Sequence, residues 1–304
     1  MFLHESYYLP FEKRVPDQQY KNLLKDVLKN GHFRDTVQGP RALTLLGPCP
    51  MRFDLRNGIP LITERNLNIK PRDQPRLWQQ AIGELIAFLH GARRLTEIEQ
   101  YGCLWWTKWV AQEGRNWFGL PYGDLGDGFY GEAFTKFPIG NGKTFDQVSA
   151  VIRQISKNPN TRTHFISPWI PHLVIGDTRK TMTTPCTGWM YFEVNGKNLS
   201  LVMTQRAGDI PIGIPFNLFQ YATFLVMVSF VTNLVPNEFV HMIMDAHIYE
   251  NQLDAVKILL KEPNKPFPTL IVNKDVENIF DFRYEDFILR DYSSGPKIEI
   301  PVTI

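Results

Sequence analysis

The sequence contains few cysteines and almost no net charge. Its 304 residues include only three cysteines, Cys49, Cys103 and Cys186, which excludes a disulfide framework and offers no paired spacing for a bound metal such as zinc. The 33 Lys and Arg residues nearly balance the 31 Asp and Glu residues, and the formal charge is +2. Because nucleic-acid binders concentrate positive charge, this balance argues against a nucleic-acid partner.

Long apolar runs and targeting signals are also missing. The longest apolar run, residues 222–231, is about half of the roughly 20 residues that a membrane span needs, so it predicts a buried core helix and no membrane partner. The N-terminal MFLHESYYLPFEKR lacks the basic and apolar regions of a signal peptide. We therefore expect a reduced, soluble, cytoplasmic protein.

Helix and strand patterns are interspersed along the chain, and no repeat or polar linker separates them. This arrangement around one core predicts a single α+β domain. Apolar residues at helical spacing predict helices at residues 19–30, 77–89, 145–155, 215–231 and 251–261. Strand patterns occur at residues 164–169, 189–194, 199–204 and 239–244, and a hairpin turn is expected at 195–197. Residues 41–53 combine strand and turn signals.

Two polar stretches carry residue types that perform chemistry. Cys186 lies in TPCTG before a strand. An ordinary free cysteine is most often an inert buried thiol. For Cys186 to act as a nucleophile, a positive charge or a hydrogen-bond donor would have to lie near its sulfur. Arg206 and Asp209 follow a strand; such residues usually form a surface pair. The apolar IPIGIPFN that follows implies instead that polar groups there need partners or a ligand.

Three further polar residues stand in patterned surroundings. His247 and Tyr249 are two apart and therefore on one face of a strand, an arrangement that is more often structural than functional. Glu84 sits on an otherwise apolar helical face, where an unpaired carboxylate is costly, so a functional role is favoured.

The order and spacing of short motifs resemble the thymidylate synthase family, a superfamily that also contains the pyrimidine-nucleotide hydroxymethylases. The motifs are GELIAFLHG, WWxxW, FYGEAF, NPNTR, PC before a strand, QRxxD, GIPFN, DAHIY, PFPTL, IFDFRYEDF and a C-terminal PVTI. They cover about residues 17–304. The resemblance implies one thymidylate synthase-like α+β domain over residues 1–304, with residues 1–16 as an N-terminal extension. It also implies a mixed β-sheet at a homodimer interface, with helices around it.

The resemblance also implies a reaction and a set of site residues. The family transfers a one-carbon unit from 5,10-methylenetetrahydrofolate to C5 of a pyrimidine nucleoside monophosphate. Cys186 matches the nucleophile that adds to C6, and Asn217 matches the amide that reads uracil, where cytosine-using members have aspartate. The remaining catalytic matches are Tyr130, Glu84, Arg206 and Asp209.

The other matched positions divide between the two substrates. Those that correspond to nucleotide contacts are Gln205, Arg206, Asn217, His247, Tyr249, Arg162 and Arg41. Those that correspond to folate contacts are Trp106, Trp109, Asp209, Gly213, Phe216 and Ile304. Arg162 matches a phosphate ligand that crosses the subunit boundary, so the active site of the expected homodimer is shared. The local role of Asn217 would be to cap the helix that follows it.

Four positions depart from the family pattern. Thr187 replaces a histidine, Ala207 replaces a serine that donates to phosphate, and Arg162 stands where the family has two arginines. VQGPRALT stands where the family has an arginine-containing phosphate loop, with Arg41 as its substitute. Three hypotheses therefore compete. The protein reductively methylates dUMP to dTMP, it 5-hydroxymethylates dUMP, dCMP or CMP, or it is an inactive paralogue that only binds nucleotide or RNA.

Overall fold

The computed structural model of the chain describes residues 7–110 and 119–303. Most of its strands form one seven-stranded sheet with the order β1-β2-β9-β8-β7-β6, and β3 also pairs with β9. The strands of this sheet are β1 (His32–Arg34), β2 (Ala42–Leu46), β3 (Met51–Asp54), β6 (Phe165–Ile166), β7 (Thr187–Asn195), β8 (Asn198–Asp209) and β9 (Val235–Tyr249). Two hairpins are separate: β4 (Phe137–Gly140) with β5 (Lys143–Phe145), and β10 (Thr269–Val272) with β11 (Phe287–Arg290).

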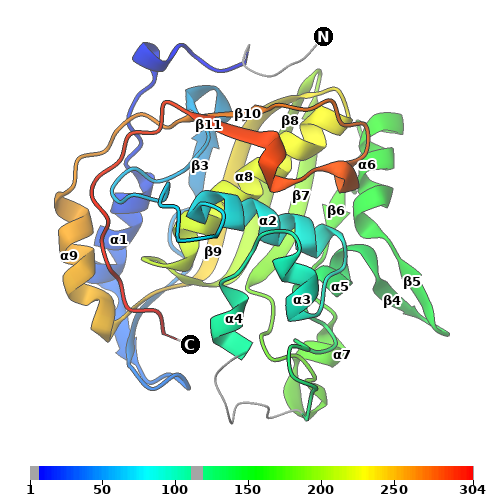
Figure 1. Cartoon of the computed structure of the whole chain (residues 1–304), viewed down its shortest axis with the longest axis horizontal. Coiled ribbons are helices and arrows are strands. Elements are labelled where there is room, and N and C mark those ends of the chain that lie inside the picture. Colours follow the sequence, from blue (N-terminus) through cyan, green and yellow to red (C-terminus); the bar gives the residue numbers. More distant parts are fainter. Residues whose placement is uncertain (1–6, 111–118, 304) are drawn as a thin grey trace.

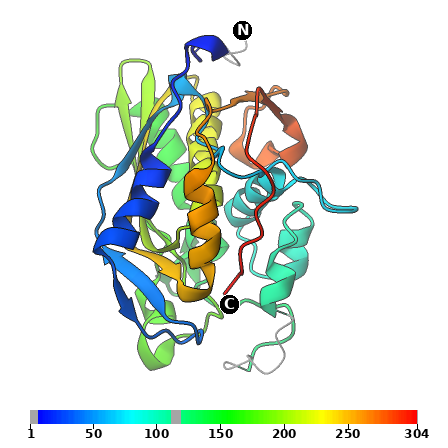
Figure 2. The same cartoon turned by 90° about the vertical axis from the view of Figure 1, so that its left-hand side faces the viewer.

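Helices gather on one side of this sheet (Figure 1, Figure 2). They are α1 (Gln19–Asn30), α2 (Leu77–Leu89), α3 (Leu95–Glu99), α4 (Trp106–Val110), α5 (Tyr130–Thr135), α6 (Gln147–Lys157), α7 (Pro171–Val174), α8 (Gly213–Val231) and α9 (Leu253–Lys261). The strands β8 and β9 pair in parallel and the other neighbours in the sheet pair antiparallel. The predicted α+β fold with a mixed sheet is therefore confirmed.

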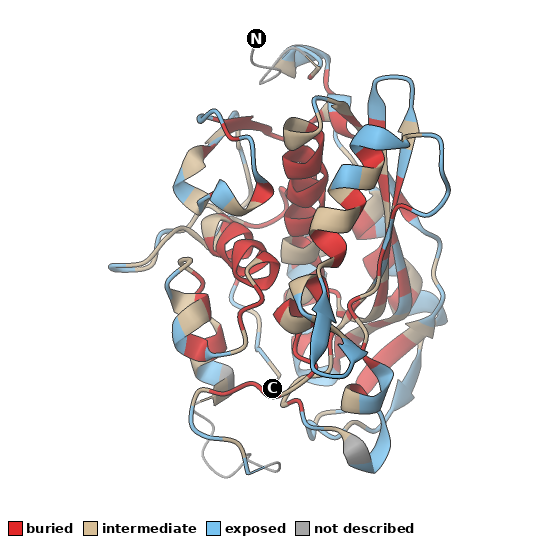
Figure 3. Ribbon diagram, turned by 90° about the vertical axis from the view of Figure 1, so that its right-hand side faces the viewer, coloured by how far each residue is buried: buried red, intermediate tan, exposed pale blue. Residues whose placement is uncertain are grey.

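The helix α8 connects the two parallel strands β8 and β9, because parallel neighbours need a crossover that returns the chain to the same end of the sheet. It is long and apolar enough to cross a membrane by length and composition, but 78% of its most apolar 18-residue window is buried inside the protein. Figure 3 shows this central helix buried along most of its length. The prediction that residues 222–231 belong to a core helix is confirmed.

Local signals place the ends of several elements. The predicted helices at residues 19–30 and 77–89 have those bounds in the structure. The helix α2 stops before His90 and Gly91, and Gly91 has φ +71°, a left-handed conformation that glycine adopts without strain. Asp146 caps α6 by accepting a hydrogen bond from the backbone N of Ser149 at 2.9 Å. The hairpin between β7 and β8 closes through Asn195 and Asn198, as predicted.

Several predicted elements differ in extent. The helix expected at 251–261 begins at Leu253, because Glu250–Gln252 form a separate 3-10 turn, and the strand expected at 189–194 spans Thr187–Asn195. The strand expected at 164–169 is only Phe165–Ile166, because the prolines at 168 and 171 interrupt pairing. The helix expected from 145 begins at Gln147, since residue 145 belongs to the β4–β5 hairpin. The strands predicted at 199–204 and 239–244 are longer, because their polar ends also pair in the sheet.

The helix expected from residue 215 begins two residues earlier, at Gly213, which corrects the role given to Asn217. This residue lies inside the second turn of α8, so it does not cap the helix. Its amide is therefore available for other partners.

The two ends of the described chain pack against the body of the protein. Arg14 donates from Nη1 to the carbonyl oxygen of Phe267 at 2.9 Å and from Nη2 to Oγ1 of Thr269 at 2.7 Å. The segment after β11 turns back and ends near α9 (Figure 1, Figure 2). The division into one domain with an extension at residues 1–16 stays a prediction.

Candidate active site

Cys186 lies directly before β7, at a point where the β7–β8 register is irregular. The pairing shifts between Thr187 and Met190, and such β-bulges redirect side chains beside functional sites. The backbone N of Cys186 donates to Oη of Tyr130 at 2.7 Å, and the backbone N of Arg206 donates to its carbonyl oxygen at 2.7 Å. Cys186 is partly exposed, whereas Cys103 is buried and Cys49 is exposed.

The guanidinium of Arg206 lies beside the sulfur of Cys186. Its Nη2 is 3.6 Å from Sγ, and the same group donates to the carbonyl oxygens of Pro185 and Thr184 at 3.3 Å each. A positive charge at this distance stabilises a thiolate by Coulomb attraction. The structure thus brings together the predicted nucleophile and the predicted cation.

A second arginine holds the same loop from its other end. Arg179 donates from Nε to the carbonyl oxygen of Thr181 at 3.0 Å and from Nη2 to that of Met182 at 2.7 Å. Burial lowers the pKa of Arg179, and the neighbouring positive charge of Arg206 lowers it further. The loop that leads into Cys186 is therefore held by two cations from one chain, of which the sequence analysis identified only Arg206.

Tyr130, at the start of α5, faces Cys186. Burial and then the nearby sulfur raise the pKa of its phenol well above the usual value, so the hydroxyl keeps its proton. Its ring stacks on Phe88 with ring centroids 4.7 Å apart. The phenol accepts from the backbone of Cys186 and retains an O–H group to donate.

Glu84 lies on α2 and is 8% exposed. Its Oε1 accepts hydrogen bonds from the indole Nε1 of Trp105 at 2.7 Å and of Trp106 at 2.6 Å, and its Oε2 accepts from Nε2 of Gln220 at 2.8 Å. Burial raises the pKa of this carboxyl group, although all three donors lower it. A Cβ at Gly83 of α2 would lie 2.2 Å from the carbonyl oxygen of Tyr101, so glycine lets the segment just before the two indoles approach the helix.

Asn217 sits between two other amides. Its Oδ1 accepts from Nε2 of Gln205 at 3.0 Å, and its Nδ2 donates to Oε1 of Gln220 at 3.4 Å. Gln205 in turn accepts from Nε2 of His241 at 2.8 Å. The predicted residues Gln205, Asn217 and Glu84 are therefore joined, through Gln220, into one row of hydrogen bonds.

Asp209 ends β8 and is tied to the C-terminal tail. Its Oδ2 accepts from Nε2 of Gln252 at 2.9 Å, and its Oδ1 accepts from the backbone N of Ile212 at 3.2 Å. The same Nε2 of Gln252 donates to the carbonyl oxygen of Pro301 at 3.0 Å. Burial raises the pKa of Asp209, and the Gln252 hydrogen bond opposes that rise.

His247 and Tyr249 share one face of β9, as their spacing predicts. Their ring centroids are 5.2 Å apart in an edge-to-face arrangement. The Nδ1 atom of His247 is 3.1 Å from Oδ1 of Asp245, whose Oδ2 forms an ion pair with Arg34 at 2.5 Å. Burial would raise the pKa of Asp245, but the His247 hydrogen bond and the nearby positive charges lower it.

An aromatic wall lies beside Arg65, whose positive charge acts on Asp209. The ring centroids of Trp105 and Phe216 are 5.2 Å apart, and the guanidinium of Arg65 lies 5.7 Å from the Phe216 centroid. Arg65 is 8% exposed, and its Nε has no hydrogen-bond partner among the described residues. Trp106, which was predicted to belong to this wall, is buried against Glu84.

The remaining predicted site residues are more peripheral or are not described. Arg41 is half-exposed and forms an ion pair with Glu250 at 2.9 Å, and Arg162 is exposed before β6. Gly213 is the first residue of α8. The Trp109 side chain and Ile304 lie outside the described residues.

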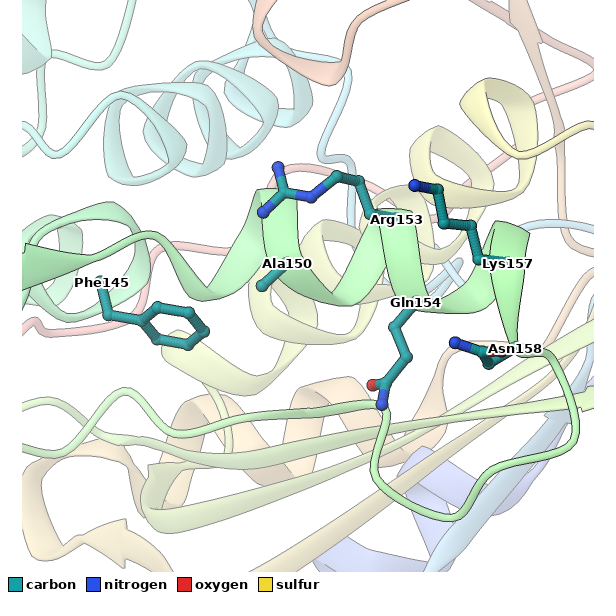
Figure 4. Close-up of a pocket in the computed structure, with 6 residues that line it drawn as sticks. All are labelled: Phe145, Ala150, Arg153, Gln154, Lys157 and Asn158. Carbon is teal, nitrogen blue, oxygen red and sulfur yellow. The ribbon is translucent and has the colours of Figure 1, made fainter.

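A surface hollow on α6 contains none of these residues (Figure 4). It has a volume of about 360 Å³ and is lined by Phe145, Ala150, Arg153, Gln154, Lys157 and Asn158. Its lining residues include no cysteine and no carboxylate, so we do not assign the site to it. No group of three or more potential metal ligands occurs in residues 7–110 and 119–303.

A partly exposed thiol beside a guanidinium, with an amide fork and buried carboxyl groups in the same region, is an arrangement suited to nucleophilic catalysis by a cysteine. A family model of thymidylate synthase matches residues 18–304, nearly the whole chain. The chain belongs to the thymidylate synthase family, whose members transfer a folate-borne one-carbon unit to a pyrimidine nucleotide.

Several residues in these contacts were not identified from the sequence. They are Trp105, Gln220, His241, Asp245, Gln252, Arg34, Arg65 and Arg179. Gln220 could have been found, because a polar residue inside an apolar helix needs a buried partner, the same signal that identified Glu84.

Proposed function

We propose that this protein is a thymidylate synthase that methylates dUMP to dTMP with 5,10-methylenetetrahydrofolate. The observation that carries the proposal is the Cys186 sulfur, partly exposed and 3.6 Å from Nη2 of Arg206. The Cys186 sulfur forms a bond to C6 of uracil, and the electron pair of the C5–C6 double bond makes C5 nucleophilic. Arg206 stabilises the thiolate before attack and also binds the phosphate.

Tyr130 and Glu84 handle the protons in this scheme. Tyr130 holds the backbone of Cys186 and has a hydroxyl that can exchange a proton near C5. Glu84 is joined to Asn217 through Gln220, so its carboxyl group is coupled to the amide that reads the base. Release of Cys186 at the end of the reaction restores the free thiol.

The residues around Asp209 fit a folate. A pterin is a flat ring with N–H donors. The Asp209 carboxylate offers an acceptor, and the Trp105 and Phe216 rings beside Arg65 offer a stacking surface. The Nε of Arg65, which has no partner in residues 7–110 and 119–303, adds a buried donor at the same wall. When bound, 5,10-methylenetetrahydrofolate supplies the one-carbon unit and the hydride that completes the methyl group, and leaves as dihydrofolate. The tail that contains Pro301 is positioned to exclude water from the site.

Hydroxymethylation of a uracil or cytosine nucleotide is the second candidate, and two substitutions favour it. Thr187 replaces the family's histidine, and its hydroxyl is engaged at 2.5 Å with Oη of Tyr221 inside the protein. Ala207 cannot donate the hydroxyl hydrogen bond that the family's serine gives to phosphate. Both differences lie within a residue of Cys186 or Arg206, so they alter the environment of the base and the phosphate.

We further propose that two copies associate through the uncovered face of the large sheet. Met242 and Met244 point away from the helices, because they alternate along β9 with the buried His241 and Ile243. Phe165 and Trp189 are large apolar side chains exposed on the same face, because the sheet register aligns them with that side of β9. Grouped apolar side chains on a sheet face are typical of subunit interfaces, and the exposed Arg162 at the β6 edge would reach the partner's site.

A covalent-trapping experiment tests the proposed function. Incubation with a 5-fluoro-2′-deoxyuridine monophosphate and 5,10-methylenetetrahydrofolate should give a stable adduct whose mass maps to Cys186. Cys186→Ser should abolish the adduct, whereas Cys49→Ser, the matched control at an exposed cysteine, should retain it. Absence of any adduct would favour the paralogue that only binds.

Product analysis then separates the two reactions. With dUMP, a methylated product together with dihydrofolate supports the synthase. A hydroxymethylated product without dihydrofolate supports the alternative. The same assay with dCMP, CMP and UMP identifies the base and the sugar.

A further inference from the structure

A row of buried polar side chains runs from His241 on β9 to Glu84 on α2. We infer that His241 is a specificity-determining positioning residue: together with Glu84 it fixes the direction of the Asn217 amide, and this direction selects uracil over cytosine. The inference rests on the proposed function, in which Asn217 reads the base. Neither His241 nor the linking residue Gln220 belongs to the motifs that identified the site.

Every link in this row pairs a donor with an acceptor. His241 Nε2 faces Gln205 Oε1 at 2.8 Å, and Gln205 Nε2 faces Asn217 Oδ1 at 3.0 Å. Asn217 Nδ2 faces Gln220 Oε1 at 3.4 Å, and Gln220 Nε2 faces Glu84 Oε2 at 2.8 Å. Because an amide has its donor and acceptor on opposite arms, the direction of one link determines the next.

The His241 end has a defined direction. The ring is fully buried, and burial lowers its pKa to about 3, so it is neutral at physiological pH and holds a single proton. A proton on Nδ1 would be a buried N–H without an acceptor, since Nδ1 has no partner among the described residues. The proton is therefore on Nε2, and Gln205 turns its oxygen toward His241 and its NH₂ group toward Asn217. The same NH₂ group also donates to the carbonyl oxygen of Ala207 at 3.0 Å, so His241 and this backbone acceptor act together on the direction of Gln205.

The Glu84 end imposes the same direction. Its carboxyl group accepts from two indoles and from Gln220. The NH₂ group of Gln220 also donates to the carbonyl oxygen of Ala81 at 3.1 Å, so its Oε1 is left to face Asn217. Both ends thus require Asn217 to turn Oδ1 toward Gln205 and Nδ2 toward Gln220.

This direction matters because uracil and cytosine present opposite patterns. After its two contacts, Asn217 retains one N–H donor and one acceptor lone pair, in an order that the row fixes. Uracil offers the O4 acceptor beside the N3–H donor, whereas cytosine offers the N4–H donor beside the N3 acceptor. To accept cytosine in the same pose, the amide would have to flip, and two donors would then meet at Gln205 and two acceptors at Gln220.

The experiment measures nucleotide preference rather than activity. Dissociation constants for dUMP and dCMP are determined by calorimetry for the wild type, His241→Phe and His241→Gln. Phenylalanine keeps the ring and removes the donor, and should lower the dCMP-to-dUMP ratio of Kd about 10-fold, which corresponds to about 1.4 kcal/mol. Glutamine places an N–H near the position of Nε2 and should restore the ratio to within about 3-fold of the wild type.

Two further proteins serve as control and second test. His164→Phe removes another fully buried histidine outside the row and should leave the ratio unchanged. Gln220→Met keeps the length of the side chain and breaks the row on the other side of Asn217, so it should also lower the ratio. If His241→Phe does not fold, two other measurements test the inference. One is the nucleotide preference of Gln220→Met, and the other is the tautomer of His241 in the wild type, read from the ¹⁵N chemical shifts of its ring.

The outcomes separate this inference from the proposed function. A wild type that binds neither nucleotide contradicts the proposed function and removes the basis of the inference. A wild type that prefers dUMP, with folded His241→Phe or Gln220→Met proteins that keep the full preference, contradicts the inference alone. A proton on Nδ1 of His241 also contradicts it, because the row would then run in the opposite direction.

Discussion

Replacing Gln252 with leucine should reveal how the C-terminal tail is coupled to Asp209. Gln252 is fully buried, and leucine fills a similar volume without polar atoms. The substitution removes the hydrogen bonds from Nε2 to Asp209 Oδ2 at 2.9 Å and to Pro301 O at 3.0 Å, and the bond from Tyr249 N to Oε1 at 3.0 Å. One change therefore frees the carboxyl group, the tail and the end of β9 from one another.

Gln147 provides a matched control. It is also buried, and its amide makes three hydrogen bonds: to Ala133 O at 2.6 Å, to Ser167 O at 2.8 Å and from Ser167 N at 3.0 Å. None of these partners is charged. Three neutral hydrogen bonds at about 0.5–1.5 kcal/mol each predict a stability loss of about 1.5–4.5 kcal/mol for Gln147→Leu at every pH.

The loss for Gln252→Leu should depend on pH. At about pH 3, below the usual Asp pKa of about 3.9, Asp209 is mostly protonated in the folded and unfolded states. All three lost bonds are then neutral, and the loss should equal that of the control. Burial already raises the pKa of Asp209, and without the Gln252 bond it should rise further. When the pKa of Asp209 is higher in the folded state than in the unfolded state, the free energy of unfolding falls as the pH rises through the folded-state pKa. This fall should be larger in the variant than in the wild type. A bond to a charged acceptor is worth about 1.5–3 kcal/mol, so the deficit should grow by about 1 kcal/mol by pH 7.

Urea unfolding of the wild type and both variants between about pH 3 and pH 7 measures these losses. Hydrogen exchange of residues 298–303 should increase in Gln252→Leu and stay unchanged in Gln147→Leu. A deficit for Gln252→Leu that is constant over this pH range, with an unchanged tail, would refute the coupling.

Other substitutions test the proposed site and dimer. Cys186→Ala should abolish turnover while nucleotide binding persists; residual turnover would mean that another group is the nucleophile. Asn217→Asp should move preference from uracil toward cytosine nucleotides, because a carboxylate accepts from the cytosine amino group, and unchanged selectivity in the binding assay would argue for another base reader. Arg162→Glu should be rescued in mixed dimers with Cys186→Ala, since one site then has both groups; no recovered activity would contradict a shared site. Met244→Glu should convert a dimer to monomers in light scattering, and an unaltered mass would exclude this sheet face.

Elements with a strong local signal were predicted closely. The helices α1 and α2 have the expected bounds because apolar spacing and a following glycine determine where they bury a face and where they end. The strand β6 was overestimated, and β8 and β9 were underestimated. The extent of a strand depends on the neighbours with which it pairs, and pairing partners are distant in the sequence.

The candidate site divides in the same way. Short motifs pointed to Cys186, Arg206, Asn217 and Glu84, because each stands in a local pattern that needs a partner or a ligand. They did not indicate that Gln220 links Asn217 to Glu84 or that Gln252 links Asp209 to the tail. These links join α8 to α2 and β8 to the C-terminal segment, which no local spacing relates.

Local order in the chain therefore determined the family, the core helices and the chemical types in the site. The tertiary structure decided which amide side chains face each other. It also connected His241 on β9 to Asn217 through Gln205. The physical reason is that apolar burial depends on composition and periodicity, which a sequence displays, whereas hydrogen bonds depend on distances of about 3 Å between groups that only the folded chain brings together.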